Sequence, residues 1–210
     1  MAYNQSALSP TYTPAQARTC RILTKQQIAT LQQRIGIVFR DPKILEWAFV
    51  HRSYLNENKS IDQDHNERLE FLGDAVLELI VTDRLFRSFP DKPEGALTSY
   101  RAALVNGSRL NDIADVLGLY EFIAMSKGQK RKNDRADRRI RVCTLEALIG
   151  AIYLDRGLGT AELFLDQWLF PDLQEVIASC KDSKSMFQEL AQEKFSITPY
   201  YVVVTESGPQ

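Results

Sequence analysis

The sequence contains few cysteines and histidines and has no long apolar run. Its 210 residues include three cysteines, which form no CxxC pair, and two histidines. A small, odd number of cysteines is typical of a reduced, cytoplasmic protein rather than a disulfide framework. No window approaches the ~18 apolar residues of a membrane span, so no membrane partner is expected. Residues 1–17 lack the basic start and the apolar stretch of a signal peptide, and residues 1–21 are predicted to form a flexible tail.

The chain also has no excess of charge of one sign. There are 26 Lys and Arg residues against 27 Asp and Glu residues, which gives a formal net charge of −1. This balance excludes a uniformly basic coat for nucleic acids, but it allows nucleic-acid binding wherever basic residues are concentrated. With 44% apolar and 25% charged residues, the composition is that of a globular protein.

Helical periodicity dominates the apolar pattern. Thr24 and the pair Asp41-Pro42 are residues typical of helix starts. A long helix is predicted over residues 66–86, and further helices over residues 94–105, 108–117, 143–155 and 160–178. On the long helix, the predicted apolar face comprises Leu69, Leu72, Val76, Leu79 and Ile80. The expected fold is an all-α domain over residues 22–178, followed by a short helix at residues 186–195 and one strand at residues 199–205.

Two segments of opposite charge lie inside the predicted helical domain. Residues 61–80 carry six acidic side chains against one base, and residues 127–141, here called the basic segment, carry eight bases against two acids. The six acids are Asp62, Asp64, Glu67, Glu70, Asp74 and Glu78. The eight bases are Lys127, Lys130, Arg131, Lys132, Arg135, Arg138, Arg139 and Arg141. The near-zero net charge is therefore the sum of two strongly charged patches.

Four of the acids, Glu67, Glu70, Asp74 and Glu78, form an acidic stripe along the long helix, on the side opposite its leucines. One interpretation is a solvated face that tolerates a repulsion of ~0.2–0.5 kcal/mol per like-charged pair. The other is a set of oxygen ligands for a hard divalent cation such as Mg²⁺. Glu146, which shares a helix face with Cys143, could complete such a site, although spacing alone does not bring the two helices together.

The basic segment has two interpretations as well. Runs of Lys and Arg in loops are usually solvated. The segment has no interleaved aromatic residues, which argues against stacking on single-stranded bases. It is suited to phosphate contacts along a duplex, which do not depend on sequence and weaken with salt.

The segment HNERLEFLGDAVL at residues 65–77 closely resembles the signature of the ribonuclease III family. Further matches support the resemblance in order along the chain: HRS at residues 51–53 precedes the signature, and EG at residues 94–95 and TLEALIGAIYLD at residues 144–155 follow it. The resemblance extends over about residues 25–178. It implies the all-α ribonuclease III endonuclease domain.

The resemblance also implies a function and a set of site residues. The implied activity is cleavage of double-stranded RNA by metal-dependent phosphodiester hydrolysis, performed by a homodimer in RNA processing. The implied cofactor is Mg²⁺, with Mn²⁺ as a substitute. Glu70, Asp74 and Glu146 match the family's metal-site acids, and Asp74 and Glu146 are the implied catalytic residues. Glu67 and Glu94 match acidic positions associated with RNA processing.

Two positions leave alternatives open. Phe71 matches an aromatic residue that the family inserts into a socket on the partner subunit, and the alternative is ordinary core packing. Cys143 stands where the family has a metal-site Asp. In one interpretation, the three remaining acids still hold Mg²⁺ and activity is reduced, with partial rescue by Mn²⁺. In the other, the domain no longer cuts and serves as a double-stranded RNA-binding or ribosome-assembly subunit. A small buried hydrophobe at this position is compatible with both.

Residues 182–210 resemble the start of a double-stranded RNA-binding domain, an α+β module of which only the first helix and strand are expected here. A lone helix and strand would not be independently stable.

Three functions are weighed: a metal-dependent endoribonuclease, a non-catalytic RNA-binding or assembly subunit, and a protein-interaction dimer without RNA affinity. The third would leave the basic segment without a role.

Overall fold

The computed structural model describes residues 22–61, 64–129, 134–179 and 191–200. Within these ranges the chain is helical, and its only β pairing is an isolated bridge between Val50 and Ala124. The predicted all-α class is confirmed. The elements are α1 (Lys25–Ile35), α2 (Pro42–Ala48), α3 (Arg52–Glu57), α4 (Glu67–Ser88), α5 (Glu94–Leu104), α6 (Gly107–Val116), the 3-10 helix η2 (Leu119–Phe122), α7 (Asp134–Arg156), α8 (Leu158–Trp168) and α9 (Leu173–Ser179). No described helix is long and apolar enough to cross a membrane.

The first two helices begin where their capping residues predict. The Thr24 hydroxyl accepts a hydrogen bond from the Gln27 backbone N–H at 3.1 Å, and the Gln27 side chain accepts one from the Thr24 N–H at 2.9 Å. This reciprocal pair satisfies two of the N–H groups that a helix start leaves without partners. Asp41 accepts from the Lys43 N–H at 3.0 Å, with Pro42 in the first helical turn.

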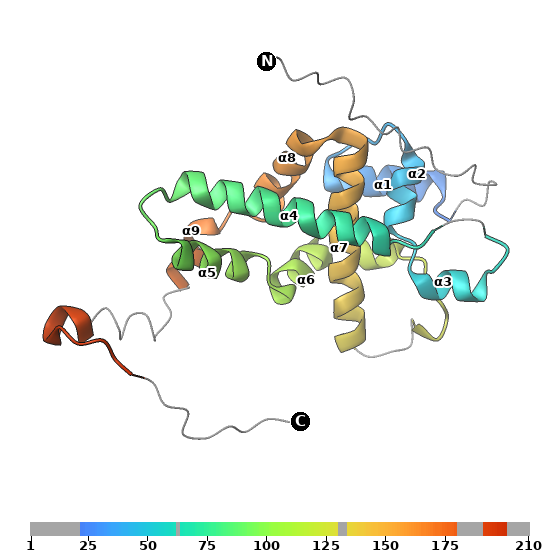
Figure 1. Cartoon of the computed structure of the whole chain (residues 1–210). Helices are drawn as coiled ribbons and strands as arrows, with labels where there is room; N and C mark the ends of the chain where they lie inside the picture. The colour runs from blue at the N-terminus through green and yellow to red at the C-terminus, as the bar shows by residue number, and fades with distance from the viewer. Residues whose placement is uncertain (1–21, 62–63, 130–133, 180–190, 201–210) are drawn as a thin grey trace, which may run out of the picture.

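The long helices α4 and α7 cross at the centre of the molecule, and both contribute side chains to its core (Figure 1). In that view α1, α2 and α8 lie above α4, while α5 and α6 lie below it. Side chains from both crossing helices are almost completely buried, including Leu69 and Leu77 from α4 and Leu145, Leu148 and Ile152 from α7. The crossing is therefore the rigid centre on which any site between these two helices depends.

Two glycines bring α4 and α7 into backbone contact. A Cβ atom built on Gly73 would lie 1.7 Å from the carbonyl oxygen of Glu146, and one built on Gly150 would lie 2.3 Å from the carbonyl oxygen of Leu69. No side chain fits at either position, because real Cβ atoms do not approach backbone oxygens so closely. Gly73 and Gly150 therefore allow the two helices to pack more closely than ordinary side chains would permit.

The basic segment was predicted as a loop, with the following helix starting at residue 143, and this is wrong in part. Helix α7 already begins at Asp134. Arg141 donates to the Asn111 side chain at 2.8 Å and pairs with Asp115 at 3.0 Å, so partners on α6 hold this first part of the helix. These contacts join residues distant in sequence, which explains why the local run of charges did not reveal the helix.

The helix predicted over residues 160–178 is two helices. α8 ends at Trp168 and α9 begins at Leu173. Pro171 lies between them; it has no backbone N–H to donate, and it disfavours helical geometry at the residue before it. The short helix α3 was not predicted, because its six residues are too few to show a period.

The predicted apolar face of α4 is correct at Leu69, Val76 and Ile80, which are buried, but wrong at Leu79. Leu79 is 56% exposed and Phe71 is 81% exposed. Both lie on the side of α4 that faces away from its buried residues, so the helix has an exposed apolar face in addition to its packed one. Core packing of Phe71 within one copy of the chain is thereby excluded.

Several predictions fall outside the described residues. These are the tail at residues 1–21, the first part of the helix at residues 186–195, and the strand beyond Tyr200. Residues 191–195 are helical, while residues 199–200 have no strand assignment. The incomplete double-stranded RNA-binding domain stays a prediction.

Candidate active site

Helices α4 and α7 each place one glutamate next to their crossing. Glu70 precedes Gly73 by three residues, and Glu146 precedes Gly150 by four, so each glutamate lies about one turn before a contact glycine. Ligand atoms of Glu70, Cys143 and Glu146 all lie within 4.8 Å of one another, and all three side chains are half-buried. The close backbone approach at the glycines is what brings these three residues together.

This arrangement corrects one prediction about the acidic stripe. The stripe was expected on the side of α4 opposite its leucines, yet the Glu70 side chain lies close to residues of α7. The reason is the backbone contact at Gly73, which brings α7 close enough to meet the residues at the border of the packed face. Asp74 is exposed and lies outside the 4.8 Å cluster, but it is near enough to Glu146 to affect its pKa.

The two ends of the acidic stripe are neutralised by basic side chains, and the middle is not. Glu67 pairs with Arg52 at 3.4 Å, and Glu78 pairs with Arg101 at 3.0 Å. Among the described residues, no basic side chain forms an ion pair with Glu70, Asp74 or Glu146. Glu70 and Asp74 are therefore the members of the stripe that have no described basic partner and can offer their oxygen atoms to an external cation.

The electrostatics of the cluster follow from burial and crowding. Burial, with Asp74 and then Glu70 nearby, raises the pKa of Glu146 to about 7. Burial, a hydrogen bond to Glu70 and the charges of Glu70 and Glu146 raise the pKa of the Cys143 thiol to about 12. The thiol is therefore neutral at physiological pH, and it donates its hydrogen to the Glu70 carboxylate.

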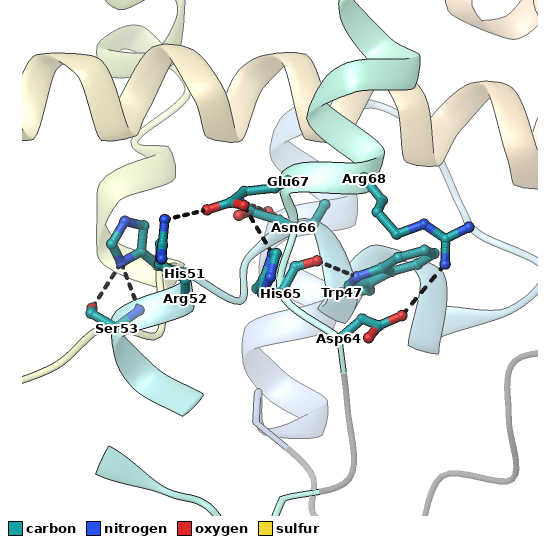
Figure 2. A network of polar contacts seen from close by, with 10 residues as sticks. Trp47, His51, Arg52, Ser53, Asp64, His65, Asn66, Glu67 and Arg68 are labelled. Atoms are coloured by element: carbon teal, nitrogen blue, oxygen red, sulfur yellow. Dashed lines mark hydrogen bonds and ion pairs between the residues drawn. The ribbon is translucent and has the colours of Figure 1, made fainter. Parts of the chain in front are cut away.

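A polar network fixes the start of α4 beside the cluster (Figure 2). The Asn66 side chain donates to the Ala48 carbonyl at 3.0 Å, and the Trp47 indole donates to the His65 carbonyl at 2.8 Å. Figure 2 shows Glu67 turned toward Arg52 and His65. Glu67 is thus beside the cluster rather than in it.

The histidine of the HRS segment has a structural task. His51 caps α3, because its Nδ1 accepts a hydrogen bond from the Ser53 backbone N–H at 3.2 Å. Burial lowers the pKa of His51.

Glu94, the second acid that resemblance associates with RNA processing, lies in the first turn of α5 and accepts a hydrogen bond from the Thr98 hydroxyl at 2.8 Å. The structure does not bring Glu94 to the cluster.

Phe71 projects from α4 beside a pocket of about 510 Å³. The sequence did not indicate this pocket, since its walls come from three separate parts of the chain. It is lined by Trp47, His65, Glu67, Arg68, Leu69, Phe71, Leu72 and Leu154. The pocket is mostly apolar, and with Phe71 at its edge it could receive an aromatic side chain.

Known proteins share both the sequence and the fold. A model of the Ribonuclease-III-like family matches residues 41–173. Ribonuclease 3 of Geobacillus kaustophilus is 43% identical over 180 residues, which span 85% of this chain and 73% of the relative. Ribonuclease 3 of Enterococcus faecalis is 39% identical over 188 residues, or 89% of this chain and 82% of the relative.

This chain belongs to the ribonuclease III family. It is an endoribonuclease by descent, and its activity is directed at RNA. The solved nuclease domain of ribonuclease III from Campylobacter jejuni has 38% sequence identity and a TM-score of 0.62, covering 68% of this chain and 96% of that domain. Dicer from Pichia stipitis has 30% identity and a TM-score of 0.50, covering 80% of this chain and 75% of that one. The predicted family and fold are confirmed.

The carboxylates of the cluster at the α4–α7 crossing fit a hard divalent cation. Crowded carboxylates with no internal cation among the described residues are what Mg²⁺ coordination requires, because Mg²⁺ prefers oxygen ligands and its charge relieves their repulsion. A neutral thiol at Cys143 is the one donor in the group that does not suit Mg²⁺. The cluster thus offers the oxygen atoms of two carboxylates, Glu70 and Glu146, and has one negative charge fewer than a carboxylate at residue 143 would provide.

Proposed function

We propose that this chain is a metal-dependent endonuclease that cleaves double-stranded RNA as a homodimer. The observation that carries the proposal is the convergence of Glu70 and Glu146 at the α4–α7 crossing, with Asp74 nearby. No basic side chain in the described part of the chain forms an ion pair with any of the three. Mutual repulsion at this point destabilises the fold unless an external cation is bound, which is the arrangement expected of a binding site rather than of a structural feature.

Glu70, Asp74 and Glu146 are the residues that would hold Mg²⁺, with Mn²⁺ as a substitute. Such an ion lowers the pKa of bound water and neutralises charge on the phosphate. Glu70 and Glu146 face each other across the two helices, so rigid backbone contacts set the separation of their carboxylates. Cys143 orients the Glu70 carboxylate by donating its thiol hydrogen, which assigns it a positioning role instead of a ligand role. Asp74 and Glu146 are the proposed catalytic residues.

The exposed Phe71 and its neighbouring pocket support a homodimer. In an isologous pair the same patch serves both copies, so Phe71 of each copy can enter the pocket of the other. The pocket includes Trp47, Leu72 and Leu154, whose apolar surfaces suit an aromatic ring. A second copy would cover Phe71, whose 81% exposure is otherwise unfavourable in water.

Double-stranded RNA as the substrate is supported by the charge of the basic segment, since duplex RNA is recognised largely through its phosphates. Within the described part of that segment, the Arg139 side chain is exposed on α7. Glu67 and Glu94 are proposed to affect RNA processing without holding the metal. A cytoplasmic location stays a prediction from the sequence.

A second function is favoured by one observation, the neutral thiol at Cys143. If oxygen ligands alone do not suffice, the domain would bind RNA or support ribosome assembly without cutting. The two functions differ in whether the parent chain cuts duplex RNA. In the first it cuts and Glu146→Gln slows cleavage strongly, whereas in the second it binds the duplex without cutting and Glu146→Gln leaves that binding unchanged.

The test is incubation of the chain with a long RNA duplex and Mg²⁺ or Mn²⁺, followed by separation of the products. Short, staggered fragments are expected, with at least a hundredfold slower cleavage for Glu146→Gln. Absence of cleavage in both metals at high enzyme concentration would contradict the nuclease proposal.

A further inference from the structure

The first turns of α7 are fixed on one side by α6 and η2. Arg141 donates to Asn111 at 2.8 Å, pairs with Asp115 at 3.0 Å, and places its guanidinium 5.6 Å from the centre of the Tyr120 ring. Burial, and then the nearby Asp137 carboxylate, raise the pKa of the Tyr120 hydroxyl. Arg141 therefore uses its charge within the fold, and these contacts set the rotation of α7 about its axis.

That rotation places Arg139 on the same face as the candidate site. Residues 139, 143, 146 and 150 follow the three- and four-residue spacing of one helix face. On this face Gly150 marks the contact with α4, Glu146 and Cys143 belong to the cluster, and Arg139 comes next toward the start of the helix. Arg138, the preceding residue, is equally exposed but points about 100° away around the helix.

Arg139 has a free positive charge within the described part of the chain. It is exposed, it forms no ion pair with any described carboxylate, and it lies one turn before Cys143 on the same helix face. Its guanidinium is therefore available to an external anion that approaches this face of α7.

We propose that Arg139 binds a phosphate group of duplex RNA at the edge of the acidic cluster, and so positions the RNA backbone against Glu70 and Glu146. An arginine suits this task because its planar group presents two parallel N–H donors to phosphate oxygens. The inference rests on the proposed function for the identity of the ligand. It assigns to Arg139 a role that Arg138 and Arg141 do not share.

The experiment measures binding of a fluorescent RNA duplex by the full chain in EDTA, where no cleavage occurs, over a range of salt concentrations. Arg139→Ala is expected to weaken binding about tenfold, and the slope of log affinity against log salt is expected to become shallower by about 0.9. Arg139→Lys should recover most of the slope, since it keeps the charge. Arg138→Ala is the matched control and should leave both quantities nearly unchanged.

Equal losses for Arg139→Ala and Arg138→Ala would overturn the inference, because they would indicate a diffuse basic surface. Unchanged binding by Arg139→Ala, or no duplex binding by the parent chain, would also overturn it. The nuclease proposal is judged separately by cleavage in Mg²⁺ or Mn²⁺. If the parent chain does not cut RNA, but Arg139→Ala weakens duplex binding and makes its salt dependence shallower, the phosphate contact is supported and the nuclease proposal is contradicted.

Discussion

Replacing Glu146 by Gln should stabilise the metal-free protein at high pH and have no such effect in acid. In the folded protein, burial and the neighbouring acids raise the pKa of Glu146 from an ordinary value of 4.5 to about 7. The folded state therefore holds this proton more tightly than the unfolded chain does. As the pH rises from 4.5 through 7, the parent chain loses stability, and above pH 7 the whole loss is present.

The size of this effect is bounded by the pKa change. Each pH unit is equivalent to 1.36 kcal/mol, so the full rise to about 7 sets a ceiling of about 3 kcal/mol. Because the side chain is only half-buried, solvent screens part of the repulsion, and we expect about 1–2 kcal/mol. Glutamine keeps the shape of the side chain and removes the charge, so Glu146→Gln should gain this amount at pH 8 and almost nothing at pH 4.

The assay is urea unfolding of both proteins in EDTA at pH 4 and pH 8, compared as the difference in free energy at each pH. The matched control is Glu175→Gln, an exposed carboxylate on α9, which should show no pH-dependent difference. Mg²⁺ added at pH 8 should stabilise the parent more than the variant. An equal difference at both pH values, or a less stable variant at pH 8, would refute the repulsion described for the cluster.

Three further outcomes are expected. Gly73→Ala should destabilise the fold by about 3 kcal/mol in thermal unfolding, because its Cβ would meet the Glu146 carbonyl at 1.7 Å, whereas Gly95→Ala, with open space around it, should be neutral or stabilising. A stable Gly73→Ala would show that α4 and α7 do not make backbone contact. Phe71→Ala should shift sedimentation from dimer to monomer without lowering the stability of the single copy, since the ring is 81% exposed; an unchanged sedimentation coefficient counts against the dimer. With the other two cysteines replaced by serine, Cys143 should resist iodoacetamide at pH 8 in the folded state and react once unfolded, because its pKa is about 12. Rapid alkylation of the folded protein would show that the thiol is not buried against Glu70.

Much of the fold could be predicted from local sequence signals. Thr24 and Asp41 predicted the starts of α1 and α2, and the structure confirms both caps. Periodicity also located α4 correctly to within two residues at each end. These signals are reliable because a cap or an apolar face acts within a few residues of its own position.

The convergence of the site could not be predicted in the same way. Glu70 and Glu146 meet because Gly73 and Gly150 allow two backbones to touch, and a glycine inside a helix gives no local sign of what it will contact. Likewise, α7 begins at Asp134 rather than at the predicted residue 143, and its first part is held by contacts with another helix, such as the ion pair of Arg141 with Asp115 on α6. The roles assigned to the acids of the site are still predictions from family resemblance, and they concern Glu67, Glu70, Asp74, Glu94 and Glu146.

The most direct test of the account compares RNA duplex cleavage by the parent chain with cleavage by Cys143→Asp, in Mg²⁺ and in Mn²⁺ separately. If the oxygen ligands at the α4–α7 crossing form a metal site, the parent should cut slowly, and Cys143→Asp should cut at least tenfold faster, with the larger gain in Mg²⁺. Absence of cleavage by both proteins in both metals would contradict the placement of the active site at this crossing. Cleavage at a rate that neither Cys143→Asp nor Glu146→Gln changes would contradict it as well.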